Sequence, residues 1–247
     1  MRTAVLRRAQ THAGPLVLIN QTHPLRQTEA VALAAPDGRR PNVLLERQAA
    51  LLLYACIRQV GGEEEIVPVS GWRSRQEQEQ IWQDTLEKEG EAFTRRYVAR
   101  PGCSEHESGL AMDLGLAAAK IDFIRPHFPD TGVCAAFRRA AARYGFIQRY
   151  RKEKEELTGI AEEPWHFRYV GVPHALLMEE HGLCLEEYAA FLRRESRLCP
   201  LGGGRRARVS YLALEGEEQQ VPLPDGCCQI SGDNQGGFVL TEWEWAP

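Results

Sequence analysis

The segment Ser104–Asp113, Ser-Glu-His-Glu-Ser-Gly-Leu-Ala-Met-Asp, and the segment Glu163–His166, Glu-Pro-Trp-His, predict one metal site and the sheet that carries it. His106, Asp113 and His166 offer the nitrogen and oxygen donors that a catalytic zinc ion takes at about 2.0–2.2 Å. Three protein ligands leave a fourth position for water, whose pKa zinc lowers to about 7. The glutamate that opens the second segment is placed to move protons.

Alternation along both segments predicts the strands that bring these side chains together. Large apolar residues occupy every second position of 109–116, and Asp113 lies among glycine and alanine on the other face. The aromatic residues of 165–169 likewise face away from His166. Two neighbouring strands would direct Asp113 and His166 into one cavity, with His106 entering from the preceding loop.

Each part of the pattern has a simpler explanation when taken alone. A histidine followed seven residues later by an aspartate is common by chance, as in His106 and Asp113. A Trp-His dipeptide more often reflects core packing than metal ligation. The combination of both segments, the small residues and Glu163 favours the metal site.

The motifs Ser-x-His-x-x-Gly-x-Ala-x-Asp and Glu-x-Trp-His resemble those of the zinc D,D-peptidases of the vancomycin-resistance type. This family includes D-Ala-D-Ala dipeptidases, D,D-carboxypeptidases and bifunctional enzymes. Ser70–Ser74 is similar to its Ser-Gly-Tyr-Arg-Ser segment, with Trp in place of Tyr, and Leu16–Asn20 to the strand that often opens the catalytic domain. The resemblance spans about residues 14–195. It implies an α+β fold of the D,D-peptidase/hedgehog type, with a central antiparallel sheet flanked by helices.

The resemblance also implies roles for individual side chains around one Zn²⁺ ion per chain. The zinc ligands would be His106, Asp113 and His166; the catalytic base Glu163; the residue that stabilises the oxyanion Arg73; and the substrate contacts Ser104 and Gln78.

Several of these roles have competing interpretations. Ser74–Glu77 is typical of a capping box that opens a helix, which would fix Arg73 just ahead of the helix N-terminus. Arg73 could instead pair with a surface carboxylate, and Gln78 is as well explained as a solvated helix residue. Glu162 is the rival of Glu163, and only geometry can separate the two.

Composition indicates an ordinary globular protein without a nucleic-acid surface. The chain has 247 residues, 43% hydrophobic and 26% charged, with a net charge of −4. Residues 1–199 hold 27 basic and 27 acidic residues, whereas residues 200–247 hold three basic and seven acidic ones. No basic patch accumulates, which argues against nucleic acid as a partner.

Cysteine usage and hydropathy predict a cytoplasmic location. Seven cysteines without regular spacing argue against a disulfide framework and favour a reducing compartment. No segment is apolar enough to span a membrane, and Met1–Asn20 lacks the apolar run of a signal peptide. For a D,D-peptidase inside the cell, the family resemblance implies small peptide substrates, namely D-Ala-D-Ala or a precursor ending in it.

Residues 1–199 are expected to form the catalytic domain and residues 205–247 a small β-rich appendage. After a loosely structured lead-in at 1–15, we expect strands at 16–20 and 66–70, an exposed loop at 149–156, and helices at 43–59, 74–87, 91–99, 133–144, 173–180 and 185–194. The helical stretch before the first motif could form a lid or wall over the site. Gly202–Gly204 predicts a linker to short strands at 207–214, 219–221, 228–230 and 238–243. The appendage is expected to pack on the catalytic domain, with dimerisation or partner binding as alternatives.

The sequence thus predicts a zinc D,D-carboxypeptidase that cleaves the D-Ala-D-Ala bond of peptidoglycan precursors, and leaves open whether it is also a D,D-dipeptidase. Two alternatives remain. One is an L-Ala-D-Glu endopeptidase of the same fold, and the other is a metal-binding module without catalysis.

Overall fold

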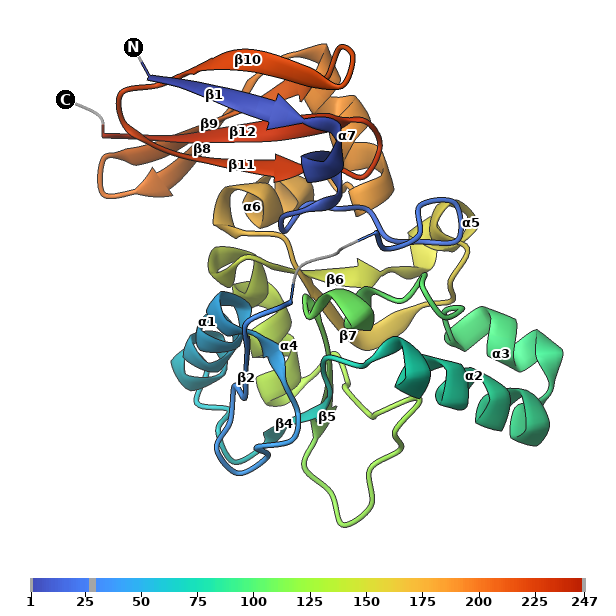
Figure 1. Cartoon of the computed structure of the whole chain (residues 1–247). Helices are drawn as coiled ribbons and strands as arrows, with labels where there is room; N and C mark the ends of the chain where they lie inside the picture. Colours follow the sequence, from blue (N-terminus) through green and yellow to red (C-terminus); the bar gives the residue numbers. More distant parts are fainter. Residues whose placement is uncertain (1, 27–29, 246–247) are drawn as a thin grey trace. The chain divides into compact units, whose positions relative to one another are not determined.

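In the computed structural model, which describes residues 2–26 and 30–245, the chain forms two compact units (Figure 1). One unit is Ile19–Ala175 and contains both motifs. The other combines the chain up to Leu18 with the chain from Leu176 onward. The expected boundary between residues 199 and 205 is therefore not the boundary between the units, because both ends of the chain contribute to the second one.

The first unit is built on a four-stranded antiparallel sheet, as the sequence predicts. Its strand order is β4-β5-β7-β6, with β4 at Ile66–Ser70, β5 at Ala111–Leu116, β7 at Glu163–Tyr169 and β6 at Phe146–Tyr150. The two motif strands, β5 and β7, are neighbours, and Asp113 lies opposite His166 in their register.

One face of this sheet is closed by helices α1 (Arg47–Gln59) and α4 (Gly132–Ala141). Met112 and Phe167 are fully buried against them, and the ring of Phe137 meets that of Phe167 edge to face at 4.9 Å. Burial of these large side chains accounts for the alternation seen in the sequence, because every second residue of β5 and β7 enters this core.

Helices α2 (Arg75–Glu89) and α3 (Glu91–Tyr97) lie on the other side of the sheet from α1 and α4 (Figure 1). The predicted capping box opens α2. The Ser74 hydroxyl accepts a hydrogen bond from the amide of Glu77 at 3.2 Å, and the Glu77 carboxylate accepts one from the amide of Ser74 at 2.7 Å. This cap fixes the chain immediately after Arg73.

Short elements connect these layers. They are β2 (Leu33–Ala34), β3 (Leu45–Glu46), and the one-turn helices η2 (Glu105–Ser108), η3 (Ala142–Tyr144), η4 (Lys152–Lys154) and α5 (Glu155–Thr158). The first long helix begins at Arg47 and not at residue 43, because Glu46 pairs with β2 and its carboxylate caps the amides of Gln48 and Ala49. The expected loop at 149–156 is wrong at its start, since Arg149 is buried in β6.

The second unit is mainly β-structure made from both ends of the chain. It contains the sheet β11-β12-β9-β8 and the pair β1-β10, with β1 at Arg2–Arg7, η1 at Arg8–His12, α6 at Val172–Glu180, α7 at Leu185–Arg194, β8 at Arg197–Gly202, β9 at Arg205–Ala213, β10 at Glu218–Leu223, β11 at Cys227–Gly232 and β12 at Gly237–Trp245. Helix α6 continues from the first unit into this one. The predicted C-terminal antiparallel sheet is confirmed for β9, β11 and β12. β8 is an addition to it, and β10, which was expected in this sheet, pairs with β1 instead.

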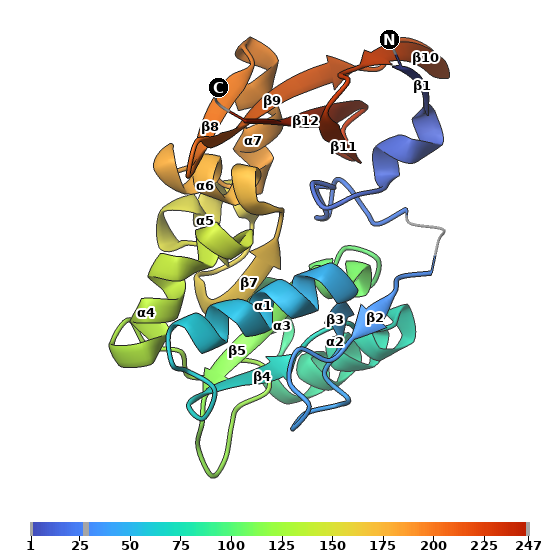
Figure 2. The same cartoon turned by 90° about the vertical axis from the view of Figure 1, so that its left-hand side faces the viewer.

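Three expectations about the chain ends are wrong, the first two because distant segments contact each other. Residues 1–15 are not a loose lead-in, because β1 lies beside β10 in both views (Figures 1 and 2) and Leu6 packs against Val221 and Phe238. The segment 16–20 is not a strand, although its residues 16–19 are buried and the amide of Leu18 donates to the carbonyl of Asp233 at 3.1 Å. Gly202, Gly203 and Gly204 all have positive φ; Gly202 ends β8 and the other two form the turn into β9, so this run is not a linker.

All seven cysteines carry free thiols. Among the described residues, no helix combines the length and apolar character needed to cross a bilayer.

Replacing the capping serine should weaken the helix that follows Arg73. We expect Ser74→Ala to lower the free energy of unfolding by about 1 kcal/mol, because the amide of Glu77 loses its acceptor. Gln76→Ala, at an exposed position in the same turn, is the control and should change it little. Denaturant unfolding would measure both variants, and equal effects would contradict the capping role.

Candidate metal centre and active site

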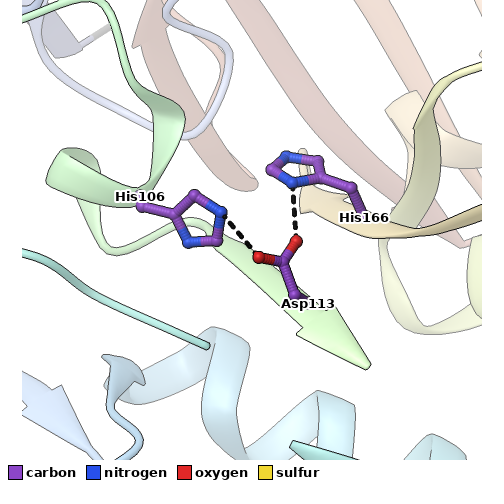
Figure 3. A group of neighbouring side chains, drawn as sticks. All are labelled: His106, Asp113 and His166. Carbon is purple, nitrogen blue, oxygen red and sulfur yellow. Dashed lines mark hydrogen bonds and ion pairs between the residues drawn. The ribbon is translucent and has the colours of Figure 1, made fainter. Parts of the chain in front are cut away.

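Three buried side chains from distant parts of the chain converge on one point (Figure 3). The Nδ1 atom of His166 lies 2.9 Å from Oδ1 of Asp113, and Nε2 of His106 lies 3.2 Å from Oδ2 of the same carboxylate. One ligand atom from each residue lies within 4.8 Å of the others. The structure therefore brings together the three metal-ligating residues predicted from the sequence.

Two glycines place His106 beside the strand ligands. The Nδ1 atom of His106 lies 2.8 Å from the carbonyl oxygen of Gly71, which makes this nitrogen the donor and leaves Nε2 facing Asp113. A side chain at Gly71 would overlap the carbonyl of Leu44, so only glycine lets the chain at position 71 pass this close to Leu44. Gly109 ends η2 with φ of 75° and turns the chain into β5.

Burial and neighbouring charges set the protonation of the three ligands in the metal-free protein. Burial, together with the charge of Arg73, lowers the pKa of His106 to about 4, so its imidazole is neutral at pH 7. Burial alone would lower the pKa of His166, but its hydrogen bond to Asp113 and the facing carboxylate of Glu105 raise it to about 9. The histidines hold the pKa of Asp113 well below its usual range despite burial. Metal binding at neutral pH would therefore displace a proton from His166.

The donor set fits a divalent cation of the zinc type. Two imidazole nitrogens and one carboxylate are a typical catalytic zinc set, which keeps one coordination position open. Each imidazole also presents its second nitrogen to a protein oxygen, the arrangement that fixes ligating histidines in metal sites. His106, Asp113 and His166 can thus hold one metal ion.

Glu163, at the start of β7, brings a fourth ionisable group to the same pocket. Its side chain is buried, with Oε2 3.6 Å from Nδ1 of His166. Burial raises its pKa to about 8, and Asp113 adds to this, whereas His166 and Arg73 oppose it. The rival Glu162 is exposed and its amide donates to Glu155. Geometry therefore selects Glu163 as the carboxylate of the pocket.

Arg73 is held by three acceptors around the pocket and does not pair with a surface carboxylate. Its guanidinium donates to the Ser70 hydroxyl at 2.9 Å, to the Gln78 side-chain oxygen at 3.2 Å and to Asp113 at 3.2 Å. Phe123 covers the guanidinium at 5.4 Å. Gln78 is fully buried, so its interpretation as a solvated helix residue is wrong.

All seven predicted site residues line one pocket, which leaves a cavity of about 40 Å³. They are Arg73, Gln78, Ser104, His106, Asp113, Glu163 and His166. Residues of α2 and α3, Ile81 and Tyr97, form part of its wall, as expected for the helical stretch before the first motif. Space of this size holds only a few water molecules.

The sequence did not reveal one group of buried charges beside the ligands. Glu105, Arg149 and Arg168 form ion pairs with no solvent exposure, and Glu105 also approaches His166. One feature of the sequence could have predicted this group, because Arg168 lies on the same strand face as His166. Arg149 gave no such signal, because it precedes a run of exposed charged residues.

Comparison with known proteins gives the class that this fold and site define. Residues 45–172 match the VanY family of D-alanyl-D-alanine carboxypeptidases. The chain is 41% identical over 184 residues to the bifunctional D-Ala-D-Ala dipeptidase and carboxypeptidase VanXYC of Enterococcus gallinarum, covering 74% of this chain and 97% of that protein. The chain belongs to the VanY D-alanyl-D-alanine carboxypeptidase family, which confirms the resemblance seen in the motifs and the prediction of a peptidase.

Solved structures of relatives agree with the fold. The vancomycin-resistance D,D-dipeptidase VanXYg, in complex with a D-Ala-D-Ala phosphinate analogue, is 44% identical and superposes with a TM-score of 0.96 over 98% of this chain and 99% of that one. A vancomycin-resistance D,D-pentapeptidase VanY, in complex with Zn(II), is 28% identical with a TM-score of 0.61 over 70% of this chain and 98% of that one. The resemblance to VanXYg therefore extends beyond residues 14–195 into the C-terminal strands, contrary to expectation.

Metal binding should stabilise the protein through these ligands. At free Zn²⁺ a hundredfold above its Kd, we expect the melting temperature to rise by about 5 to 10 °C, because only the folded site binds the ion. Asp113→Asn should remove most of this rise, and Asp130→Asn, at an exposed carboxylate paired with Arg138, should keep it. Differential scanning calorimetry would measure the shift, and equal rises in both variants would contradict the site.

Proposed function

We propose that this protein is a zinc-dependent D,D-carboxypeptidase, with D,D-dipeptidase activity as well, that hydrolyses the D-Ala-D-Ala bond of peptidoglycan precursors. The observation that carries the proposal is the buried Glu163 carboxylate beside the convergent ligands His106, Asp113 and His166. Support comes from one relative that is named for both activities and from another that was solved with a D-Ala-D-Ala analogue.

One Zn²⁺ ion per chain, held by His106, Asp113 and His166, would polarise the scissile carbonyl and lower the pKa of a water molecule to about 7. Glu163 would act as the catalytic base. Its side chain is buried beside the ligands, so its carboxylate can accept a proton from the attacking water and then give it to the leaving amine.

Arg73 supplies fixed positive charge where the carbonyl oxygen becomes negative. Its guanidinium is oriented by Ser70 and Gln78, so little rearrangement is needed during the reaction. We assign Ser104 and Gln78 to substrate contacts because both line the pocket. The Gln78 amide also donates to the carbonyl of Ala99 at 2.8 Å and links α2 to the segment before the first motif.

The alternatives draw less support. The presence of Glu163 and Arg73 in the pocket argues against a metal-binding module without catalysis. No contact in the pocket favours an L-Ala-D-Glu endopeptidase. The cytoplasmic location and a dimer formed through the C-terminal appendage stay predictions.

Release of D-Ala tests the proposed function directly. The protein should release D-Ala from free D-Ala-D-Ala and from a pentapeptide ending in D-Ala-D-Ala, and comparison of kcat/KM for the two substrates would give the balance of the two activities. A chelator should abolish release and added Zn²⁺ should restore it, because the ligand set leaves catalysis dependent on the ion. Activity that survives complete metal removal would refute the mechanism.

The two adjacent glutamates offer a matched pair of variants. Glu163→Gln should lower kcat by about 10²- to 10⁴-fold, since the amide cannot accept a proton, while Zn²⁺ remains bound. Glu162→Gln should leave kcat unchanged, because that side chain is exposed. Steady-state kinetics with metal analysis would measure both, and a loss of activity confined to Glu162→Gln would reverse the assignment.

A further inference from the structure

Behind the predicted metal ligands lies a fully buried charge cluster, which we call the Glu105 cluster, of Glu105, Arg149 and Arg168. Oε1 of Glu105 accepts from Nε of Arg149 at 2.7 Å and lies 2.8 Å from Nη1 of Arg168. All three side chains have 0% solvent exposure. Two arginines from the neighbouring strands β6 and β7 thus hold one oxygen of this carboxylate.

The other oxygen of Glu105 faces a ligand histidine. Oε2 lies 3.5 Å from Nε2 of His166, longer than an ordinary hydrogen bond. Both atoms are buried, and neither has a hydrogen-bond partner among the residues that the structure describes. Leaving a buried polar atom without a partner is unfavourable, so a proton on Nε2 that points at this oxygen satisfies both groups.

The position of that proton determines which nitrogen of His166 can bind a metal. A neutral imidazole carries its proton on one nitrogen and a lone pair on the other. Nδ1 is the nitrogen that faces Asp113 and Glu163, at 2.9 and 3.6 Å. Only the tautomer protonated at Nε2 therefore directs its lone pair toward the other ligands.

We propose that Glu105 is a positioning residue that keeps the His166 proton on Nε2 and thereby presents Nδ1 to the metal. The inference rests on the zinc site of the proposed function. Because Arg149 and Arg168 hold its other oxygen, Glu105 cannot turn away from His166. Tyr150 packs its ring against His166 at 5.0 Å and limits rotation of the imidazole. The carbonyl of Gly71 has the same effect on His106. It keeps the proton of that ring on Nδ1 and leaves Nε2 for the metal.

Glu107 provides a matched control on the same turn of helix. Like Glu105 it is a buried carboxylate of η2, and it accepts from the amide of Gly102 at 2.6 Å and from Arg75 at 3.1 Å. Its partners lie outside the set that contacts His166. A general loss of stability from neutralising a buried glutamate should therefore affect both positions, whereas loss of the positioning effect should affect Glu105 alone.

The first experiment uses the wild-type protein loaded with Zn²⁺ and labelled with ¹⁵N-histidine. Long-range ¹H–¹⁵N correlation spectra should show His166 bound through Nδ1 with its proton on Nε2, and His106 with the opposite pattern. Coordination of His166 through Nε2 would overturn the proposal without any mutation.

The second experiment measures Zn²⁺ affinity by competition with a chromogenic chelator. Glu105→Gln should weaken binding by about 10- to 100-fold, the usual effect of losing a partner of a ligating histidine. Glu105→Asp keeps the charge that Arg149 and Arg168 require but withdraws the carboxylate from His166, so it should fold and also bind more weakly. Glu107→Gln should bind as the wild type does.

Two outcomes would reject the inference: unchanged affinity in Glu105→Asp, or an equal loss in Glu107→Gln. If Glu105→Gln does not fold, Glu105→Asp and the wild-type spectra decide. Failure of the proposed function is distinguishable, because it would appear in the wild type as absent Zn²⁺ binding or absent D-Ala release. Wild-type binding with unaffected Glu105 variants would reject the positioning role alone.

Discussion

The pairing of β5 with β7 is the constraint on which the whole site depends. Its register places Asp113 opposite His166, and the neighbouring pairing of β4 with β5 places Ser70 opposite Asp113. One row across the sheet thus supplies two ligands and the hydroxyl that orients Arg73. A slip of one residue would turn these side chains into the core and Met112 and Phe167 out of it, so the same burial that stabilises the sheet specifies the site.

The polar face of the sheet carries several charged side chains that are buried and therefore not screened by water. Asp113, Glu163, Glu105, Arg149 and Arg168 are buried in one region beside the partly buried Arg73, and each carboxylate is compensated differently. Glu105 has two arginines, whereas Asp113 has two histidines and Arg73. Burial of such groups is costly unless each is paired. Three carboxylates and three arginines balance in formal charge, so the nitrogen and oxygen donors of His106, Asp113 and His166 are what suit the region to a cation.

The sequence predicts most of the first unit because its signals are local. The capping box of Ser74, the alternation of β5 and β7 and the metal motifs each lie within a few residues. The missed features depend on partners far along the chain. β1 is a strand only because β10 is present, and Arg149 is buried only because Glu105 compensates its charge. A run of charged residues in sequence does not reveal which of them will be neutralised in the fold.

The pairing of β1 with β10 constrains the order in which the two units can fold during translation. Arg2 lies opposite Leu223, so β1 leaves the ribosome long before its partner β10 has been synthesised. The unit Ile19–Ala175 contains its own sheet and can fold during translation, with both metal motifs inside it. The second unit, which is made from both ends of the chain, folds last because contacts across such long sequence separations form slowly.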